Sequence, residues 1–242
     1  MSITAVWGPP NSGKTTLAID LAFALSRSGK TVCLISPEPF SELPYIFGVK
    51  LMNPQSIEAA YHTPGNLKQV VFQLDNLLFI LAEHYFANVF DEPESLSEVK
   101  NVLAEASAEF DCVIVDCPSS ADNTMAAWAM NQADSILLLT GCRSSSIAWY
   151  QAYSRAIGAV AMKTIHVCVQ CNDSYDYRGL NNMIKVTPAV WVPFFPDAEA
   201  VQRQRRTLYD SSGRSGKAYT AAVDEIGAEI LYKEADHEYH TT

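Results

Sequence analysis

The feature that most constrains this chain is a glycine-rich loop near its N-terminus, with the spacing G-x-x-x-x-G-K-[ST]. The loop follows an apolar stretch at residues 3–7 and precedes residues 14–28, in which leucines recur every four positions. Its residues are Gly8, Pro9, Pro10, Asn11, Ser12, Gly13, Lys14 and Thr15. A strand before this spacing and a helix after it are the context of a Walker A phosphate loop. We therefore expect a nucleotide to bind between this strand and this helix.

The residue types of the loop suit the phosphates of ATP or GTP. Glycines let backbone N–H groups turn toward phosphate oxygens, and the N-terminus of the following helix adds its positive dipole end. Lys14 is expected to reach the β- and γ-phosphates, and the Thr15 hydroxyl to bind Mg²⁺. Thr16 is expected to contact the α-phosphate. A glycine-rich turn without a ligand is the alternative, and the combination of motif and context disfavours it.

A triphosphate site also needs a carboxylate that holds the shell of ligands around the metal. Asp116 ends the apolar run at residues 112–115 and is followed by Cys117 and Pro118. Open α/β sheets bind ligands at the carboxyl ends of their strands, so we expect Asp116 beside the phosphate loop. The alternative is a loop aspartate that caps a turn.

Apolar strands alternate with helices along the remaining chain. Strands are predicted at residues 3–7, 31–36, 77–81, 112–115, 136–140, 165–170 and 189–192. Helices are predicted at residues 14–28, 55–61, 95–109, 123–132, 147–157, 198–205 and 216–233. Buried strands separated by helices form parallel sheets that are covered on both faces. The prediction is an α/β, three-layer P-loop NTPase with a mostly parallel sheet, forming a single nucleotide-binding domain over residues 1–242.

Charge and composition narrow the classes of function. The formal net charge of −10 argues against a general electrostatic grip on nucleic acid. No stretch approaches the ~20 apolar residues that span a bilayer, so no transmembrane segment is expected. The six cysteines are scattered, which is typical of a reduced, cytoplasmic protein. Cys168 and Cys171 lie on a predicted strand with their side chains on opposite faces, which favours structural cysteines over a metal site.

Several segments resemble the ParA/MinD group of P-loop ATPases. Residues 113–118, Val-Ile-Val-Asp-Cys-Pro, are similar to that family's hydrophobic-Asp-x-Pro segment, and residues 31–39 resemble its second strand. Residues 170–173 resemble the strand end whose asparagine reads adenine, and residues 192–197 resemble the last strand with its base-contacting loop. The resemblance implies ATP and Mg²⁺ as ligands. It places Asn172, Pro193 and Phe194 at the base, and Lys14, Glu38 and Asp116 in hydrolysis.

Two positions depart from the family pattern. The family's loop carries a second lysine after the first glycine, which reaches the partner's nucleotide across a dimer, and here that position is Pro9. The family's Asp-x-Asp becomes Ser36 and Glu38, of which Glu38 could still orient water or the ligands around the metal. Positive charge stabilises phosphoryl transfer, so the missing lysine predicts slow hydrolysis with binding intact. Degenerate loops of this kind resemble the CpaE/TadZ branch, which positions pili or secretion machinery.

Together these features predict an ATP-dependent switch. Nucleotide binding would favour a homodimer that positions or partitions a pilus, secretion or conjugation assembly or a plasmid, and hydrolysis to ADP would release the partner. A catalytically inactive nucleotide-bound scaffold is one alternative. A bacterial tyrosine-kinase-like phosphotransferase is another, prompted by tyrosines at positions 209, 219, 232 and 239, although they are widely spaced. Adenine and guanine both remain open, because Asn172-Asp173 also echoes the guanine-reading motif without its lysine.

The C-terminal third carries two features that relatives use for DNA or membranes. Arg203, Arg205 and Arg206 form a basic cluster, which we interpret as a solvated helix end since so few charges contribute little phosphate-contact energy. Apolar positions within residues 223–231 have helical spacing and are expected in the core. The acidic and polar residues 233–242 do not suit an amphipathic membrane helix. The protein is therefore expected in the cytoplasm, with recruitment to a membrane-associated or polar assembly through its partner.

Overall fold

One sheet joins the strands of the molecule. The computed structural model describes residues 1–51, 55–83, 94–120, 122–141 and 143–240, and side chains through residue 232. In this part of the chain the strand order is β3-β4-β2-β5-β1-β6-β7-β8. The strands are β1 (Ser2–Trp7), β2 (Val32–Ser36), β3 (Phe72–Asp75), β4 (Leu78–Ala82), β5 (Cys112–Asp116), β6 (Ser135–Thr140), β7 (Thr164–Val169) and β8 (Val190–Val192). Neighbouring strands are parallel except β3 and β4, which are antiparallel.

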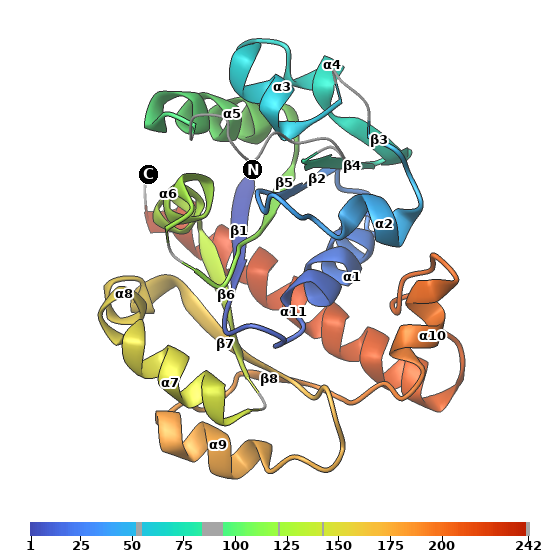
Figure 1. Cartoon of the computed structure of the whole chain (residues 1–242), viewed down its shortest axis with the longest axis vertical. Coiled ribbons are helices and arrows are strands. Elements are labelled where there is room, and N and C mark those ends of the chain that lie inside the picture. The colour runs from blue at the N-terminus through green and yellow to red at the C-terminus, as the bar shows by residue number, and fades with distance from the viewer. Residues whose placement is uncertain (52–54, 84–93, 121, 142, 241–242) are drawn as a thin grey trace.

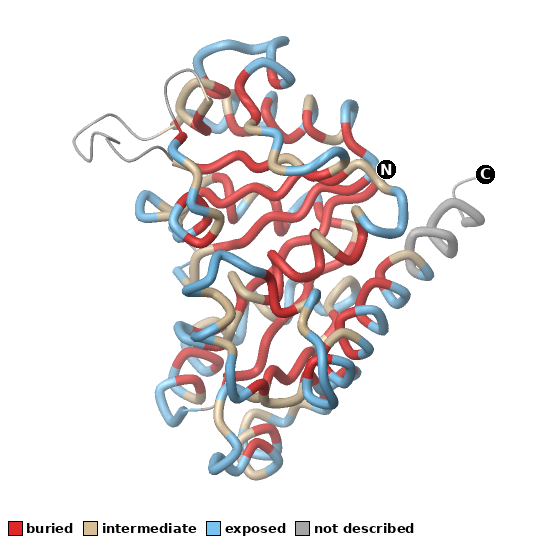
Figure 2. Tube along the Cα trace, turned by 90° about the vertical axis from the view of Figure 1, so that its right-hand side faces the viewer, coloured by how far each residue is buried: buried red, intermediate tan, exposed pale blue. Residues whose placement is uncertain are grey.

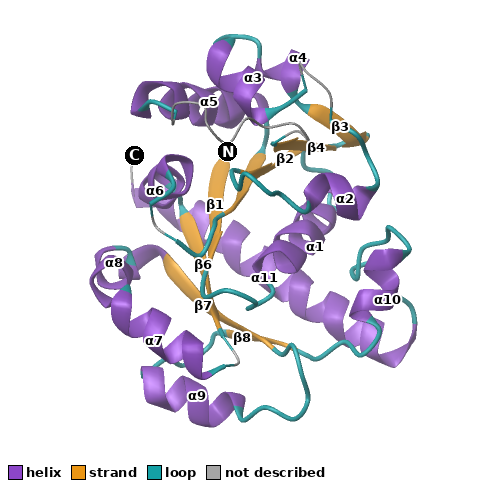
Figure 3. Ribbon diagram, viewed as in Figure 1, coloured by secondary structure: helices purple, strands orange, loops and turns teal. Residues whose placement is uncertain are grey.

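Helices cover both faces of this sheet (Figures 1 and 3). They are α1 (Lys14–Arg27), α2 (Leu43–Phe47), α3 (Ile57–His62), α4 (Leu67–Val70), α5 (Leu96–Glu109), α6 (Thr124–Gln132), α7 (Ser144–Ala152), α8 (Ser154–Ala159), α9 (Tyr177–Ile184), α10 (Ala198–Arg203) and α11 (Gly213–His240), with the short 3₁₀ turn η1 (Ala161–Lys163). Two large buried clusters form among the described residues, one with α1 and α11 and one with α3, α5, α6 and α7, besides a small one of Cys168 and Tyr177. Figure 2 shows the strands buried between these layers, with exposed residues on the outer sides of the helices. The expected three-layer α/β fold is confirmed.

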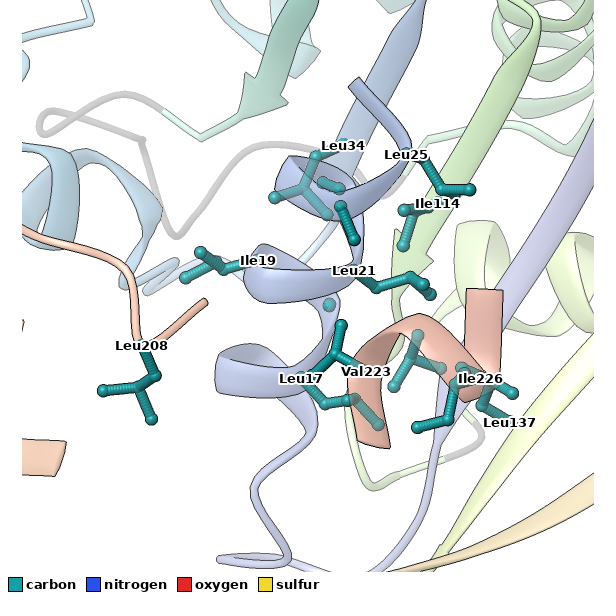
Figure 4. Close-up of a cluster of buried hydrophobic side chains, with 14 of the residues drawn as sticks. Leu17, Ile19, Leu21, Leu25, Leu34, Ile114, Leu137, Leu208, Val223 and Ile226 are labelled. Atoms are coloured by element: carbon teal, nitrogen blue, oxygen red, sulfur yellow. The ribbon is translucent and has the colours of Figure 1, made fainter. Parts of the chain in front are cut away.

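The helix that follows the phosphate loop is anchored by packing on both of its sides. Figure 4 shows Leu25 of α1 beside Ile114 of β5, and Leu17 of α1 beside Val223 of α11, with Leu21 between them along the helix and Ile226 of α11 close by. All of these side chains are at most 3% exposed. Burying an aliphatic side chain of this size contributes about 1.5–3 kcal/mol relative to leaving it exposed. The C-terminal helix α11 is therefore part of the core, as its periodicity predicted. It packs against α1, the helix that begins at the end of the phosphate loop.

The structure also adds elements that the sequence patterns did not predict. The antiparallel edge strand β3 and the helices α2, α4 and α9 were not expected. The predicted helix 147–157 is divided at Tyr153, where the ring packs against Trp7 and Trp149. The predicted helix 198–205 ends at Arg203, and Arg205 has a left-handed φ of 58°. The last helix runs from Gly213 to His240, beyond its predicted limits of 216 and 233.

Candidate nucleotide-binding site

The loop between β1 and α1 has a backbone shape that depends on its glycines. A Cβ on Gly8 would lie 2.9 Å from the carbonyl oxygen of Leu139 in β6. Gly13 has a φ of 86° and forms the N-cap of α1, and a Cβ there would lie 3.1 Å from Cγ1 of Val169. Side chains at these two positions would force the loop off β6 and β7. The loop is thus held against the sheet, and the N-terminus of α1 opens beside it.

Lys14 is buried at the inner side of the loop, with 8% of the residue exposed. Its Nζ donates to the carbonyl oxygen of Pro9 at 3.2 Å and to Oγ of Ser119 at 2.7 Å. Burial lowers the pKa of Lys14 from its ordinary value, and the nearby charges of Asp116 and Glu38 act in the opposite direction. The ammonium is therefore held by two neutral acceptors among carboxylates that favour its charge.

Thr15 and Asp116, the two residues that the sequence assigned to Mg²⁺, contact each other. The Thr15 hydroxyl donates to Oδ2 of Asp116 at 2.8 Å. Asp116 lies opposite Val6 in the β1–β5 register, at the carboxyl end of the strands, and is 3% exposed. Burial raises the pKa of Asp116 to about 7, although the bond from Thr15 and the charge of Lys14 lower it. Its Oδ1 is buried without a hydrogen-bond partner among the described residues, so it can accept a bond from a metal-bound water.

A cavity of about 290 Å³ lies in front of the loop. It is lined by Pro10, Asn11, Ser12, Gly13, Lys14, Thr15, Thr16, Glu38, Glu42 and Ser119. Gly8 and Pro9 are not among the lining residues, and Pro9 contributes its carbonyl to Lys14 instead. Burial raises the pKa of the half-buried Glu38, and the charge of Lys14 lowers it. The cavity thus has the cationic Lys14 on one side and the carboxylates of Glu38 and Glu42 among its other lining residues, a combination that suits phosphates with a divalent cation.

Two lining residues of this cavity were not predicted. Ser119 stands three residues after Asp116, and a hydroxyl so close to the Asp-x-Pro segment could have been noticed in the sequence. Glu42 precedes α2, and no pattern in the sequence pointed to it.

A second cavity of about 140 Å³ shares Gly13 and Thr16 with the first. Its other lining residues are Val169, Gln170, Cys171, Pro193, Phe194, Phe195, Ala198, Leu208 and Tyr219. Pro193 and Phe194, which the resemblance assigns to the base, thus line a cavity that adjoins the phosphate loop. Asn172 is not a lining residue, and its Oδ1 accepts bonds from the backbone N–H and the hydroxyl of Ser174. Gln170, whose Oε1 accepts from the N–H of Phe194 at 3.4 Å, lines the cavity and was not predicted.

The arginine cluster singled out in the sequence is not among the lining residues of these two cavities, whereas Cys171 lines the second one. Arg203 pairs with Glu199 on the surface, and the side chain of Arg205 lies over Gly48. Cys168 is buried and Cys171 is exposed. Over the described residues, no group of three or more histidines, cysteines or carboxylates is placed to hold a metal ion. Nor does that part of the chain contain a helix long and apolar enough to span a membrane.

Comparisons with known proteins agree on one family. A family model described as an AAA domain matches residues 10–166. The septum site-determining protein MinD of Bacillus subtilis is 26% identical over 151 residues, which are 60% of this chain and 55% of that protein. The chain spans about half the length of the curated relatives it matches.

Solved structures show the same fold over nearly the whole chain. MinD of Pyrococcus horikoshii OT3, solved with Mg-ADP, superimposes with a TM-score of 0.77 at 15% identity, covering 96% of this chain and 99% of that one. A ParA family ATPase of Chlorobium tepidum TLS also has a TM-score of 0.77, at 14% identity, covering 94% of this chain and 99% of that one. The eight-stranded sheet with helices on both faces is thus shared with these proteins.

Proposed function

Because this chain belongs to the AAA domain family, as a ParA/MinD-type P-loop ATPase, we propose that it binds ATP with Mg²⁺ and hydrolyses it slowly. Lys14 and the loop backbone would hold the phosphates. Thr15 and Asp116 would hold the metal and its water. Mg²⁺, when bound, would neutralise charge on the phosphates.

The observation that carries this proposal is the arrangement of Lys14, Thr15 and Asp116 at the N-terminus of α1. The Thr15 hydroxyl and the Asp116 carboxylate touch, and the second carboxylate oxygen is buried without a partner among the described residues. A buried carboxylate oxygen without a partner beside a hydroxyl that donates to the other oxygen is a poor arrangement for a purely structural contact and a good one for a hydrated cation. The adjoining cavity lined by Pro193 and Phe194 has room for the base. These contacts support adenine nucleotide binding by analogy with the Mg-ADP relative.

We further propose that nucleotide binding is linked to homodimer formation and to capture of a partner protein. The support is membership in a family that includes MinD and ParA proteins. Pilus, secretion or conjugation machinery and plasmid partition are the partner classes that the sequence suggested. Assignment to the CpaE/TadZ-like branch rests on Pro9 alone and stays part of this proposal.

The second candidate is a nucleotide-bound scaffold without useful turnover. Two departures favour it: Pro9 in place of the family's second lysine, and Ser36 in place of its first aspartate. For the tyrosine-kinase alternative, one of the four tyrosines that prompted it is buried and another, Tyr232, is 67% exposed. Tyr219 is 3% exposed, and its hydroxyl donates to the buried Asp20. Tyrosine autophosphorylation of the purified protein would support this alternative.

Single-turnover hydrolysis of ATP by wild type and by Lys14→Ala tests the proposal. Removing the charge-assisted contact should weaken ATP affinity by about 10- to 100-fold in calorimetry and abolish phosphate release. Lys100→Ala on α5 is the matched control, since it removes a lysine whose ammonium lies over Trp128. Unchanged ATP affinity in Lys14→Ala would contradict the assignment of the loop. If wild type binds ATP but releases no more phosphate than Lys14→Ala does, the nucleotide-bound scaffold without turnover becomes the better description of the function.

A further inference from the structure

A chain of hydrogen bonds connects α7 to the lysine of the phosphate loop. Nε1 of Trp149 donates to the backbone carbonyl of Ser119 at 2.8 Å. The hydroxyl of the same Ser119 accepts from Nζ of Lys14 at 2.7 Å. Trp149 and Ser119 are 30 residues apart in sequence, so only the fold brings them together. The indole of Trp149 therefore binds the backbone of Ser119, whose side chain in turn contacts Lys14.

The indole of Trp149 is fixed in its orientation by other aromatic rings. Trp149 is 9% exposed, and its ring centroid lies 4.8 Å from that of Trp7 at the end of β1. The rings of Tyr150 and Tyr153 lie at 5.3 Å and 4.9 Å. The contacts with Trp7 and Tyr150 are edge-to-face and the contact with Tyr153 is tilted, and edge-to-face aromatic pairs stabilise a ring beyond the burial of its area. These ring contacts fix the direction in which the Nε1–H group points.

The next residue of α7 makes a parallel contact under the loop. The Tyr150 hydroxyl donates to the carbonyl of Leu139 at 3.0 Å. That same carbonyl oxygen is the atom that a Cβ on Gly8 would approach to 2.9 Å. Two consecutive side chains of α7 therefore bind backbone carbonyls next to the phosphate loop. Tyr150 binds the Leu139 carbonyl beside Gly8, and Trp149 binds the carbonyl of Ser119, which contacts Lys14.

We propose that Trp149 is a positioning residue for nucleotide binding. Its bond to the Ser119 backbone fixes the position of the Ser119 hydroxyl, and that hydroxyl orients the Lys14 ammonium at the phosphate loop. The proposal rests on the proposed function, because it concerns the lysine that would bind the phosphates. It assigns Ser119 as the direct contact and Trp149 as the residue that acts through it.

The charges around Lys14 explain why a neutral acceptor is useful there. Asp116 and Glu38 both interact electrostatically with Lys14, and Glu42 lines the same cavity. A lysine that formed an ion pair with one of these carboxylates would have to break it before meeting a phosphate. The Ser119 hydroxyl and the Pro9 carbonyl orient the ammonium without neutralising it. Preorganised donors of this kind need no rearrangement when the ligand arrives.

A double-mutant cycle tests the proposal, with ATP affinity measured by calorimetry in the presence of Mg²⁺. Ser119→Ala should weaken ATP binding by about tenfold, since it removes a hydrogen bond to a charged group. Trp149→Phe keeps the aromatic packing, removes only the N–H donor, and should weaken binding by a similar factor. In the Ser119→Ala background, Trp149→Phe should have no further effect, because the hydroxyl that it positions is gone. Ser119→Thr, which keeps the hydroxyl, should restore affinity.

Trp128→Phe is the matched control, since Trp128 lies on α6 beside Lys100. It should leave ATP affinity unchanged. The melting temperature of every variant is measured as well. If Trp149 had only a structural role, Trp149→Phe would lower the melting temperature together with the ATP affinity. Equal losses of affinity from Trp149→Phe in both backgrounds would overturn the proposal, as would wild-type affinity in Ser119→Ala. If wild type and Trp128→Phe themselves fail to bind ATP, the proposed function is wrong, and this outcome is distinguishable from the others.

Discussion

At the scale of single residues, Asp116 is the carboxylate that we propose for Mg²⁺, and its protonation would then control binding of that cation. Burial raises the pKa of this carboxyl to about 7, with Glu38 and Glu42 adding to the increase. Below pH 7 the protonated form predominates, and a protonated carboxyl is a poor partner for a cation or its water. Binding of a divalent cation must then release the proton.

We therefore expect the gain in ATP affinity that Mg²⁺ provides to grow as the pH rises from 6 to 8. Calorimetry in buffers of different ionisation enthalpy measures both the affinity and the protons released. ATP itself titrates in this range, so the informative quantity is the difference between wild type and Asp116→Asn. The variant should lose most of the Mg²⁺-dependent gain at every pH. A variant that keeps the wild-type pH dependence would show that another group controls the metal site.

The residues of the site differ in how far the sequence could predict them. Lys14 and Thr15 follow from a local motif, and Asp116 follows from its place at the end of an apolar run, so short-range patterns were enough. The contacts of Ser119 and Trp149 join segments that no local pattern relates. Asn172 was assigned to the base from resemblance, and in the structure its side-chain oxygen binds Ser174 while Gln170 lines the cavity. Its role at the base stays a prediction.

At the scale of elements, a buried carboxylate links the phosphate-loop helix to the C-terminal helix. Asp20 of α1 is 0% exposed and accepts bonds from the Tyr219 hydroxyl of α11 at 2.7 Å and from the N–H of Tyr209 at 3.0 Å. Burial raises the pKa of Asp20 to about 7, and these bonds lower it. The pKa of Asp20 is higher in the folded than in the unfolded state, so Asp20 contributes fully to the free energy of unfolding at acidic pH, where the carboxyl is protonated. This contribution is lost as the pH rises through 7.

The difference in melting temperature between Asp20→Asn and wild type should consequently move in favour of the variant as the pH rises from 5 to 8. A change of 1 kcal/mol shifts the midpoint of a chain of this size by about 2–4 °C, which thermal melts resolve easily. Asp224→Asn is the control: Asp224 is an exposed carboxylate of α11 that accepts from the Tyr209 hydroxyl, and its removal should leave the slope unchanged. Parallel melting curves for Asp20→Asn and wild type across this range would refute the linkage.

Elements with strong apolar periodicity were predicted from the sequence, and elements defined by tertiary contacts were not. The strand β5 and the helix α5, with its Ser95 capping box, are signalled by their own residues. The strand β3 alternates between half-buried and exposed side chains, and it exists because β4 offers it an antiparallel edge. The division between α7 and α8 falls at Tyr153, whose ring contacts Trp7. Such features depend on partners that are distant in sequence.

At the scale of the whole molecule, the position of Pro9 determines what a dimer could contribute to hydrolysis. In the family pattern a lysine at this position reaches the partner's nucleotide, and here no cation stands between Pro9 and Ser12. The backbone of Pro9 is nevertheless in use, since its carbonyl accepts from Lys14. A substitution at this position keeps that carbonyl, so a lysine could be introduced without removing the contact.

Pro9→Lys should therefore raise the rate of ATP hydrolysis by at least about tenfold, because a positive charge near the transferred phosphoryl group stabilises its transition state. If the charge acts across a dimer, the rate per molecule should rise with protein concentration, in step with dimer formation measured by sedimentation velocity with ATP and Mg²⁺. Pro9→Met is the matched control, similar in length and uncharged, and it should hydrolyse ATP as slowly as wild type. Lys14→Ala should sediment as a monomer under the same conditions. A rate increase in Pro9→Lys that is independent of concentration would mean that the lysine acts within one molecule, and would count against nucleotide-linked dimerisation as the basis of the switch.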